Sequence, residues 1–230
     1  MAAHVLQGDP DIPLILRPSV RARRITLRVS QVDGRVTVTL PQRVPEREAL
    51  AFAAQKEAWI RAHLAKRQGL VSVQHDTVLP IEGQAHTVVP GTGRAVQAGQ
   101  GALRVPGPSE KAGPRVLGYL KGRARDRLAA ACDLYAGRLG RSYSGIALRD
   151  TRSRWGSCSS AGRLMFSWRL ILAPPPVLDY VAAHEVAHLA QMNHSPAFWN
   201  EVTRIHGPYK VPRQWLRDHG ASLHRYRFGD

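Results

Sequence analysis

The sequence predicts an α+β fold from three observations. Segments with alternating apolar residues and segments with apolar residues every three or four positions both occur, but they do not alternate as βαβ units. The chain of 230 residues is 43% hydrophobic, which is enough to bury a core and excludes a wholly disordered chain. Its length fits one large domain or two small ones. We predict two, a β-rich region with one helix over residues 1–110 and a second domain over residues 111–230.

The first predicted elements are a hairpin and a helix. Apolar and polar residues alternate over residues 25–29 and 36–40, and the pair Asp33-Gly34 between them suits a tight turn because it tolerates positive φ. A helix is expected next, with Pro45 near its first turn. Its apolar side is predicted to carry Leu50, Ala53, Ala54, Ile60 and Leu64.

The middle of the chain predicts short strands and then a long helix. Residues 71–110 are rich in Gly, Pro and Val, a composition typical of short strands and loops. The helix is expected from about Pro114 to Leu139, and Gly140 can close it. One stripe of this helix is apolar and consists of Leu117, Leu120, Ala124, Leu128, Ala131 and Tyr135.

The region after the long helix predicts strands around a polar loop. A strand is expected at residues 146–148, a loop over 151–160 and a β-like stretch over 164–172. Our hypothesis is that residues 164–169 form an edge strand, to which a further extended segment can be added. Three prolines at residues 174–176 end this stretch and open another helix.

The chain is strongly basic. It has 33 Lys and Arg against 17 Asp and Glu, a net charge of +16, and a pI of about 11.1. A charge of this size attracts polyanions. Because Arg outnumbers Lys 28 to 5, compositional bias explains the charge equally well, and no RNP, KH or zinc-finger pattern is present. The charge therefore predicts non-specific association with nucleic acid and leaves a specific nucleic-acid partner open.

The sequence predicts a cytoplasmic protein with no membrane partner. No apolar run reaches the roughly 20 residues that cross a bilayer, and residues 1–18 lack the basic and apolar regions of a signal peptide. The two cysteines, Cys132 and Cys158, are too few for a disulfide framework.

The most informative segment is the run His184-Glu185-Val-Ala-His188. Residues four apart share one face of a helix, so both imidazoles can bind one metal ion, with Glu185 beside it. A random shuffle of this composition is expected to contain the pattern roughly 0.01 times. The neighbouring residues are apolar nearly all round, which predicts a buried helix. Two histidines and a glutamate inside a protein need a partner, and Zn²⁺ provides one.

A catalytic zinc site needs a third protein ligand and an open position. His194 is our candidate, provided that the helix ends before it. Asn193 tolerates a left-handed conformation and Pro196 forbids continuation, so we expect the break there. Ser195 then predicts the N-cap of the next helix, with Pro196 at its first position. That helix offers Glu201 as the alternative ligand.

Five other residues are weaker candidates for the site. Cys158 can ligate a metal, although a small packed residue explains it better. Asp179 is expected in the first turn of the helix, where a carboxylate complements the helix dipole. His206, Tyr209 and Arg154 can stabilise a developing oxyanion, although structural roles explain each of them as well.

At this point the sequence resembles the YgjP-like family, bacterial proteins described as zinc metallopeptidases and related to the SprT-like and WLM groups. The segments that carry the resemblance are Arg154-Trp-Gly-Ser-Cys158, Leu170-Ile-Leu-Ala-Pro174, Asp179-Tyr-Val181, His184-Glu-x-x-His188, Asn193-His194-Ser195 and Phe198-Trp199. The resemblance implies that residues 111–230 form a zincin-like metallopeptidase domain with an HExxH active-site helix. It also implies that His184, His188 and His194 are zinc ligands and that Glu185 is the catalytic acid and base.

These observations predict a zinc-dependent metallopeptidase, a hydrolase that acts on peptide or protein substrates. One Zn²⁺ would lower the pKa of a water molecule to roughly 7, and Glu185 would take its proton and return it to the leaving amine. The alternative is a nucleic-acid-associated protein in which the zinc is structural, with Glu201 or Cys158 as fourth ligand. A protease acting on DNA-bound proteins is a further alternative, suggested by relatives of the family.

Overall fold

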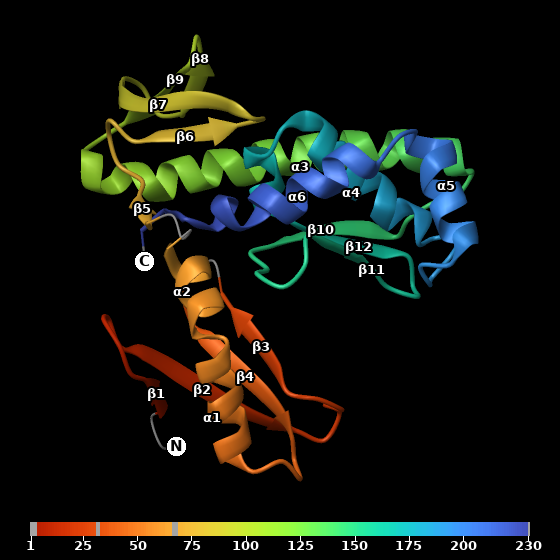
Figure 1. Ribbon diagram of the computed structural model, residues 1–230. Helices are drawn as coiled ribbons and strands as arrows, with labels where there is room; N and C mark the ends of the chain where they lie inside the picture. The colour runs from red at the N-terminus through yellow and green to blue at the C-terminus, as the bar shows by residue number, and fades with distance from the viewer. Residues whose placement is uncertain (1–3, 31–32, 66–68, 230) are drawn as a thin grey trace. The chain divides into compact units, whose positions relative to one another are not determined.

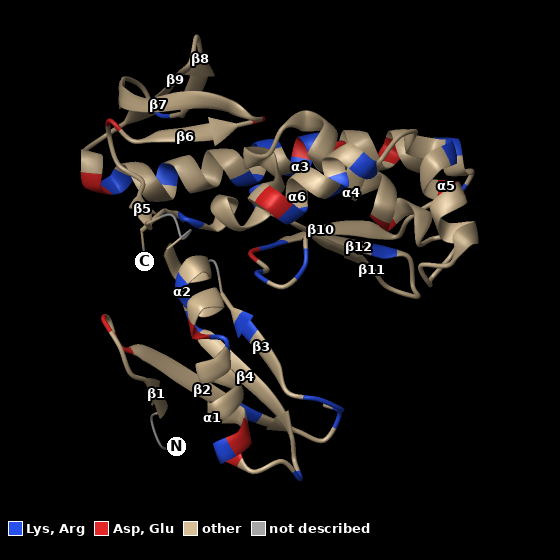
Figure 2. Ribbon diagram, viewed as in Figure 1, with Lys and Arg blue, Asp and Glu red and all other residues tan. Residues whose placement is uncertain are grey.

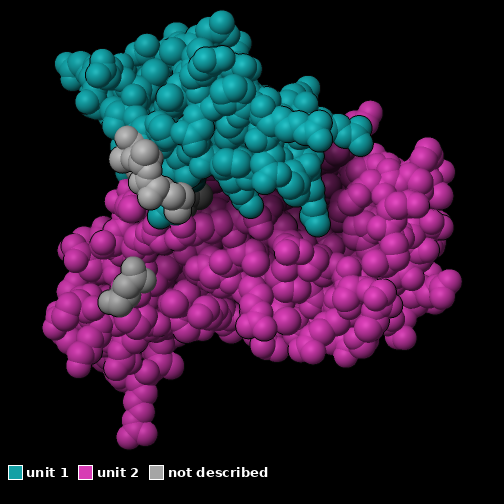
Figure 3. All heavy atoms as spheres, turned by 90° about the horizontal axis from the view of Figure 1, so that it is seen from below, with its two compact units in different colours: residues 1–69 teal, residues 70–230 magenta. Residues whose placement is uncertain are grey.

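The computed structural model describes residues 4–30, 33–65 and 69–229, and it divides the chain into two compact units (Figure 1). Unit 1 is Met1–Gly69 and unit 2 is Leu70–Asp230, coloured teal and magenta in Figure 3. Each unit has its own cluster of buried apolar side chains. The protein is thus of mixed α+β class, in agreement with the fold class predicted from the sequence.

Unit 1 contains a four-stranded mixed sheet. Its strands are β1 (His4–Leu6), β2 (Ile12–Ser19), β3 (Thr26–Val29) and β4 (Val36–Pro41), in the order β1-β2-β4-β3. Strands β3 and β4 pair antiparallel, which confirms the predicted hairpin. Gly34 in its turn has a φ of 72°, the positive value that the turn was expected to require.

The predicted helix of unit 1 is two helices, α1 (Glu46–Gln55) and α2 (Glu57–Ala65). Helix α1 ends at Gln55, and the residue that follows, Lys56, has a φ of −99° and a ψ of 12°. The residues that the two helices bury are Ala49, Ala53 and Ile60. Ala54, predicted on the apolar side, is exposed. The reason is that Ala49 and Ala53 are four apart and share the inward face, whereas Ala54 is turned about 100° away from Ala53.

Unit 2 begins with short strands, as predicted for residues 71–110. The strands are β5 (Val71–Ser72), β6 (Val78–Ile81), β7 (Gln84–Gly91), β8 (Gln97–Gly99) and β9 (Ala102–Pro106). Strands β6 to β9 form one sheet in the order β6-β7-β9-β8. A short 3-10 helix, η1 (Ser109–Lys111), leads into the long helix that follows.

Helix α3 (Ala112–Leu139) is the longest element of the chain and confirms the predicted helix. Gly140 closes it in the left-handed conformation, with a φ of 73°. The predicted apolar stripe is buried from Leu120 to Tyr135, but its first member is Val116, because Leu117 is only partly buried. Helix α3 packs against strand β9 of one sheet and strand β10 of the next, which lie at different points along its length (Figure 1).

The boundary between the compact units differs from the predicted boundary after residue 110. The structure divides the chain after Gly69, because the strands between Leu70 and Pro106 belong to the core of unit 2. The residues of these strands that share this core with α3 are Leu79, Ile81, Val88, Leu103 and Val105. The composition of residues 71–110 indicated short strands but could not indicate which core they join.

The second sheet of unit 2 corrects the edge-strand hypothesis. Its strands are β10 (Gly145–Arg149), β11 (Gly156–Cys158) and β12 (Arg163–Ser167), in the order β10-β12-β11. Strand β12 is central, because β10 pairs with it in parallel and β11 pairs with it antiparallel. The prediction that residues 164–169 form an edge strand is therefore wrong, and the open edges belong to β10 and β11. The strand also ends at Ser167, since residues 168–172 form a 3-10 helix, η2 (Trp168–Leu172).

The C-terminal part of unit 2 is helical. Its elements are α4 (Pro175–Ala187), α5 (Pro196–His206), α6 (Lys210–His219), the 3-10 helix η3 (Gly220–His224) and strand β13 (Tyr226–Arg227), which pairs with β5. The Arg169 side chain anchors this end of the chain. Its Nε donates to Asp150 Oδ1 at 2.7 Å and its Nη1 donates to the carbonyl of Leu223 at 3.0 Å. Within the described residues, no helix has both the length and the apolar character needed to cross a membrane.

His224 makes the stability of the fold sensitive to acid. The side chain is buried beside Trp155, and burial, together with the positive charge of Arg169, lowers its pKa from 6.5 to about 4. The unfolded chain therefore binds a proton at a higher pH than the folded chain does. The contribution of a neutral His224 to the free energy of unfolding is fully present above about pH 6.5. It is lost as the pH falls toward 4.

We expect the free energy of unfolding of the metal-free protein to fall between pH 7 and pH 4.5, with about 2–3 kcal/mol of that fall due to His224. Urea unfolding of wild type and of the His224→Gln variant at both pH values measures this contribution. The variant should lose less stability than the wild type between the two pH values. An equal loss in the two proteins would show that His224 does not titrate as described.

Candidate metal centre

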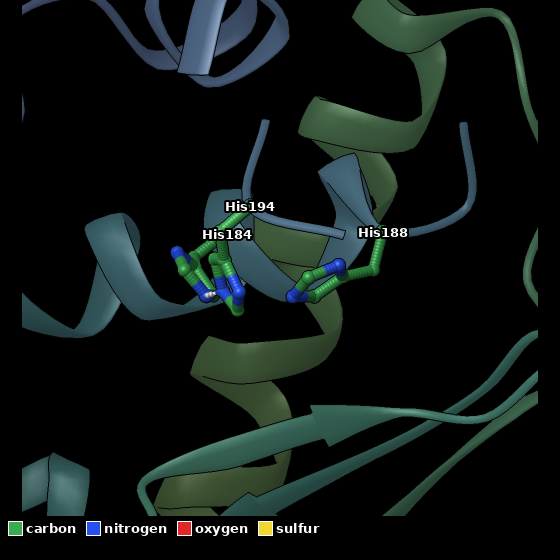
Figure 4. Close-up of side chains that lie close together, drawn as sticks. All are labelled: His184, His188 and His194. Atoms are coloured by element: carbon green, nitrogen blue, oxygen red, sulfur yellow. Dashed lines mark hydrogen bonds between the residues drawn. The ribbon is translucent and has the colours of Figure 1, made fainter. Parts of the chain in front are cut away.

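Three histidines meet at the end of helix α4. His184 lies in its last turn, His188 directly follows its last residue, and His194 lies in the segment between α4 and α5. Their ligand nitrogens all lie within 4.8 Å of one another. Figure 4 shows the ring of His188 pointing toward the rings of the other two. The structure thus brings together all three residues that the sequence predicts as metal ligands.

The segment between α4 and α5, which carries His194, differs in detail from the prediction. Helix α4 ends at Ala187, earlier than the expected end near Asn193. Asn193 does not adopt the left-handed conformation. Its Oδ1 instead accepts a hydrogen bond from the backbone nitrogen of Ser195 at 3.2 Å. Ser195 caps α5 and Pro196 lies in its first turn, as predicted. The tight segment between the two helices places His194 beside the motif.

His184 and His188 are held in the neutral form that metal binding requires. His188 Nδ1–H donates to the carbonyl of Gln191 at 2.9 Å, which leaves Nε2 as the unprotonated nitrogen. Burial lowers the pKa of His188. Burial, together with the neighbouring His188 and His194, lowers the pKa of His184 to about 3. Neutral imidazoles present lone pairs to a cation.

The spacing of His184 and His194 is close to that of two ligands of a tetrahedral zinc ion. The Nε2 atoms of His184 and His194 lie 3.1 Å apart. Zinc–nitrogen bonds of 2.0–2.1 Å in a tetrahedron place two ligand nitrogens about 3.3–3.4 Å apart. The Nδ1 of His184 is buried and has no hydrogen-bond partner in the described part of the chain. A cation at Nε2 would therefore be the main polar partner of this ring.

Glu185 lies against strand β11. Its side chain is 6% exposed, and burial raises its pKa to about 8, while the positive charge of Arg154 acts in the opposite direction. A Cβ built on Gly156 of β11 would lie 2.5 Å from Glu185 Cγ and 2.6 Å from its Oε1. The close approach of β11 to the Glu185 carboxyl group therefore requires glycine at position 156. The sequence analysis named Gly156 within a segment of the resemblance but gave it no role, because only the folded chain brings it against Glu185.

The alternative ligands lie outside the cluster of histidines. Glu201 pairs with Arg204, with 2.6 Å between Glu201 Oε2 and Arg204 Nη2. Cys158 donates from Sγ to the carbonyl of Ser159 at 3.4 Å, and burial raises the pKa of its thiol. Asp179 is the fifth residue of α4, so the prediction that places it in the first turn is wrong. Burial also raises the pKa of Asp179.

Of the three predicted oxyanion stabilisers, Arg154 alone lines the pocket at Glu185. This pocket has a volume of about 330 Å³, and Glu185, His184 and Arg154 all line it. Tyr209 instead stacks on Trp199, with 4.8 Å between ring centroids. His206 is also outside the pocket lining, and burial lowers its pKa. The sequence analysis assigned no role in the site to the other lining residues, which are Trp155, Gly156, Tyr180, Val181, Arg213, Leu216 and Arg217. The first four of these lie in segments that carry the family resemblance.

Comparison with protein families gives the class of this protein. A family model described as YgjP-like, metallopeptidase domain, matches residues 23–219. Most of the chain is therefore a domain of metallopeptidase type. The chain belongs to the YgjP-like family, which confirms the family that the sequence motifs predict. The match begins within unit 1 and ends at the last residue of α6.

Comparison with solved structures and with curated proteins adds little. The chain is similar to the metallopeptidase zymogen abylysin of Pyrococcus abyssi, with 18% sequence identity and a TM-score of 0.36. The similarity covers 40% of this chain and 92% of the abylysin chain. Neither fold nor function follows from a similarity of this size. Among curated proteins nothing matches the chain.

Proposed function

We propose that this protein is a zinc-dependent metallopeptidase of the HExxH type with a zincin-like catalytic domain. His184, His188 and His194 hold one zinc ion, and Glu185 is the general base. The observation that carries this proposal is the meeting of three imidazoles, with ligand nitrogens within 4.8 Å, next to a buried carboxyl group. Membership of a metallopeptidase family supports the same chemistry.

Proton transfer is the task of Glu185 in this mechanism. A zinc ion bound by the three imidazoles would supply a Lewis acid and lower the pKa of a coordinated water to roughly 7. Glu185 accepts the proton of the attacking water and returns it to the leaving amine. Without a metal, burial raises the pKa of Glu185 to about 8. A nearby dication favours the ionised form that this step needs.

We place the substrate along strand β11. This strand has an unpaired edge in the sheet β10-β12-β11, and its first residue, Gly156, lies against Glu185. An extended peptide can add to such an edge through main-chain hydrogen bonds. Addition at β11 would bring a peptide bond close to the Glu185 carboxyl group. Strand β11 thereby takes the role that the sequence analysis assigned to residues 164–169.

The alternative, a nucleic-acid-associated protein with a structural zinc, has less support. A structural zinc is normally enclosed by four protein ligands. In the part of the chain that the structure describes, no fourth His, Cys, Asp or Glu joins the three histidines. Lysines and arginines are distributed over both units (Figure 2), so the net charge of +16 does not by itself define a nucleic-acid site.

Zinc content tests the proposal directly. The wild-type protein, reconstituted with zinc and dialysed, is expected to hold one zinc ion per chain by elemental analysis. His188→Ala should weaken zinc binding by at least about a hundredfold, because a ligand matters at least as much as the groups that orient it. His86→Ala is the matched control, because His86 lies outside the cluster and its Nδ1–H donates to the carbonyl of Gln84. A wild-type protein without zinc, or a His188→Ala protein with full zinc, would contradict the proposal.

A further inference from the structure

Three arginines line the pocket beside Glu185. Arg154 comes from the loop before β11, whereas Arg213 and Arg217 come from α6. Arg213 and Arg217 are four residues apart and so share one face of the helix. Among the described residues that line this pocket, Glu185 is the sole carboxylate. The pocket therefore carries an excess of positive charge next to the proposed general base.

No acidic side chain among the described residues forms an ion pair with any of these three guanidinium groups. Other arginines of unit 2 do have such partners, as Arg169 pairs with Asp150 and Arg204 pairs with Glu201. Two like charges four residues apart on a helix repel each other. A bound anion would remove this repulsion and satisfy the guanidinium donors.

Aromatic side chains pack against Arg213 and beside Arg154. The Arg213 guanidinium carbon lies 4.6 Å from the centre of the Trp199 ring, a favourable cation–π contact. Trp199 in turn stacks on Tyr209. Next to Arg154, the Trp155 ring packs against the end of α6, where a Cβ on Gly220 would lie only 2.9 Å from Trp155 Cζ2. Contacts of this kind fix the positions of charged groups before a ligand binds.

We propose that Arg154, Arg213 and Arg217 form an anion-binding subsite that selects substrates with an acidic group near the cleaved bond. Guanidinium groups bind carboxylates and phosphates through paired hydrogen bonds. The acidic group is therefore an Asp or Glu side chain, the carboxylate at a peptide C-terminus, or a phosphate. Selection during hydrolysis rests on the proposed peptidase function, whereas anion binding itself does not.

Peptide binding to the zinc-loaded Glu185→Gln protein tests the subsite. Four matched fluorescent decapeptides are compared: capped peptides with a central Glu, Gln or phosphoserine, and the Gln peptide with a free C-terminus. At least one acidic peptide should bind about tenfold more tightly than the capped Gln peptide, and the tightest one identifies the source of the anion. Adding Arg213→Gln or Arg217→Gln should remove most of this preference.

Arg125→Gln is the matched control, because it removes the same charge from an exposed position of α3 outside the pocket. This change should leave the preference for acidic peptides unchanged. Equal binding of the acidic and Gln peptides would overturn the subsite. An equal loss of preference in the Arg125→Gln and Arg213→Gln proteins would overturn it too, because both would then act through net charge alone.

Titration with inorganic phosphate and pyrophosphate separates this proposal from the proposed function. Wild type and the Arg213→Gln and Arg217→Gln variants are compared by calorimetry with equal zinc contents, so that a difference reports on the arginines. Binding that the variants weaken about tenfold, with no peptide hydrolysed by the wild type, would support the subsite and contradict the peptidase. Hydrolysis of peptides without acidic preference, with kcat/KM unchanged in Arg213→Gln, would contradict the subsite alone.

Discussion

Glu185→Gln is expected to lower kcat for peptide hydrolysis by about a thousandfold and to leave one zinc ion bound per chain. The amide of Gln has nearly the shape of the carboxyl group but cannot accept a proton from water. Glu185 is not one of the three clustered nitrogen donors, so its replacement removes no metal ligand. Turnover of a peptide substrate and zinc content, measured on the same preparation, check both parts of the expectation.

The matched control for this variant is Glu110→Gln. Glu110 is an exposed residue of η1 and does not line the pocket at Glu185, so its replacement should leave kcat unchanged. Thermal unfolding of both variants should confirm that they are folded. A Glu185→Gln protein with more than about a tenth of wild-type turnover would remove Glu185 from the mechanism.

Gly156→Ala is expected to lower kcat/KM by about a hundredfold, because it displaces the proposed base without removing any chemical group. The new Cβ would lie 2.5 Å from Glu185 Cγ, a distance at which either Glu185 or β11 must move. The pairing of Gly156 with Phe166 of β12 resists movement of the strand. The Glu185 carboxyl group should therefore shift, and peptide hydrolysis measured at equal zinc content reports the shift.

Gly118→Ala provides the matched control for Gly156→Ala. Gly118 is exposed on α3, and a Cβ built there would meet no other atom within 4 Å. Its replacement should leave kcat/KM unchanged and stabilise the helix by about 0.5–1 kcal/mol, because alanine is the better helix former. Full activity of the Gly156→Ala protein would show that β11 does not constrain Glu185 during the reaction.

Some features of the candidate site are local in sequence, and these were predictable. The spacing of His184 and His188 places both on one helix face wherever that helix lies. Ser195 and Pro196 start a new helix by local rules of capping, so a turn before them was expected. The position of His194 beside the motif also depends on α4 ending at Ala187, which the sequence did not predict. The roles of the three histidines and of Glu185 stay predictions until zinc content and turnover are measured.

Other features depend on contacts between distant segments, and local patterns could not predict them. Gly156 precedes Glu185 by 29 positions, and only the packing of β11 on α4 brings the two together. The same holds for Arg213 and Arg217, whose place in the pocket depends on how α6 packs on α4.

The periodicity of apolar residues predicted α3 and, together with the turn pair Asp33-Gly34, the hairpin β3–β4, because helices and hairpins are stabilised between near neighbours. The helix that carries the His184-Glu185 pair was predicted from the spacing of its motif and from the prolines before it. The central position of β12 and the membership of β6–β9 in the core of unit 2 became evident only in the tertiary structure. Strand order and core membership depend on which apolar surfaces cover one another. That choice is made between segments far apart in the chain, so it leaves no periodic signal within any one of them.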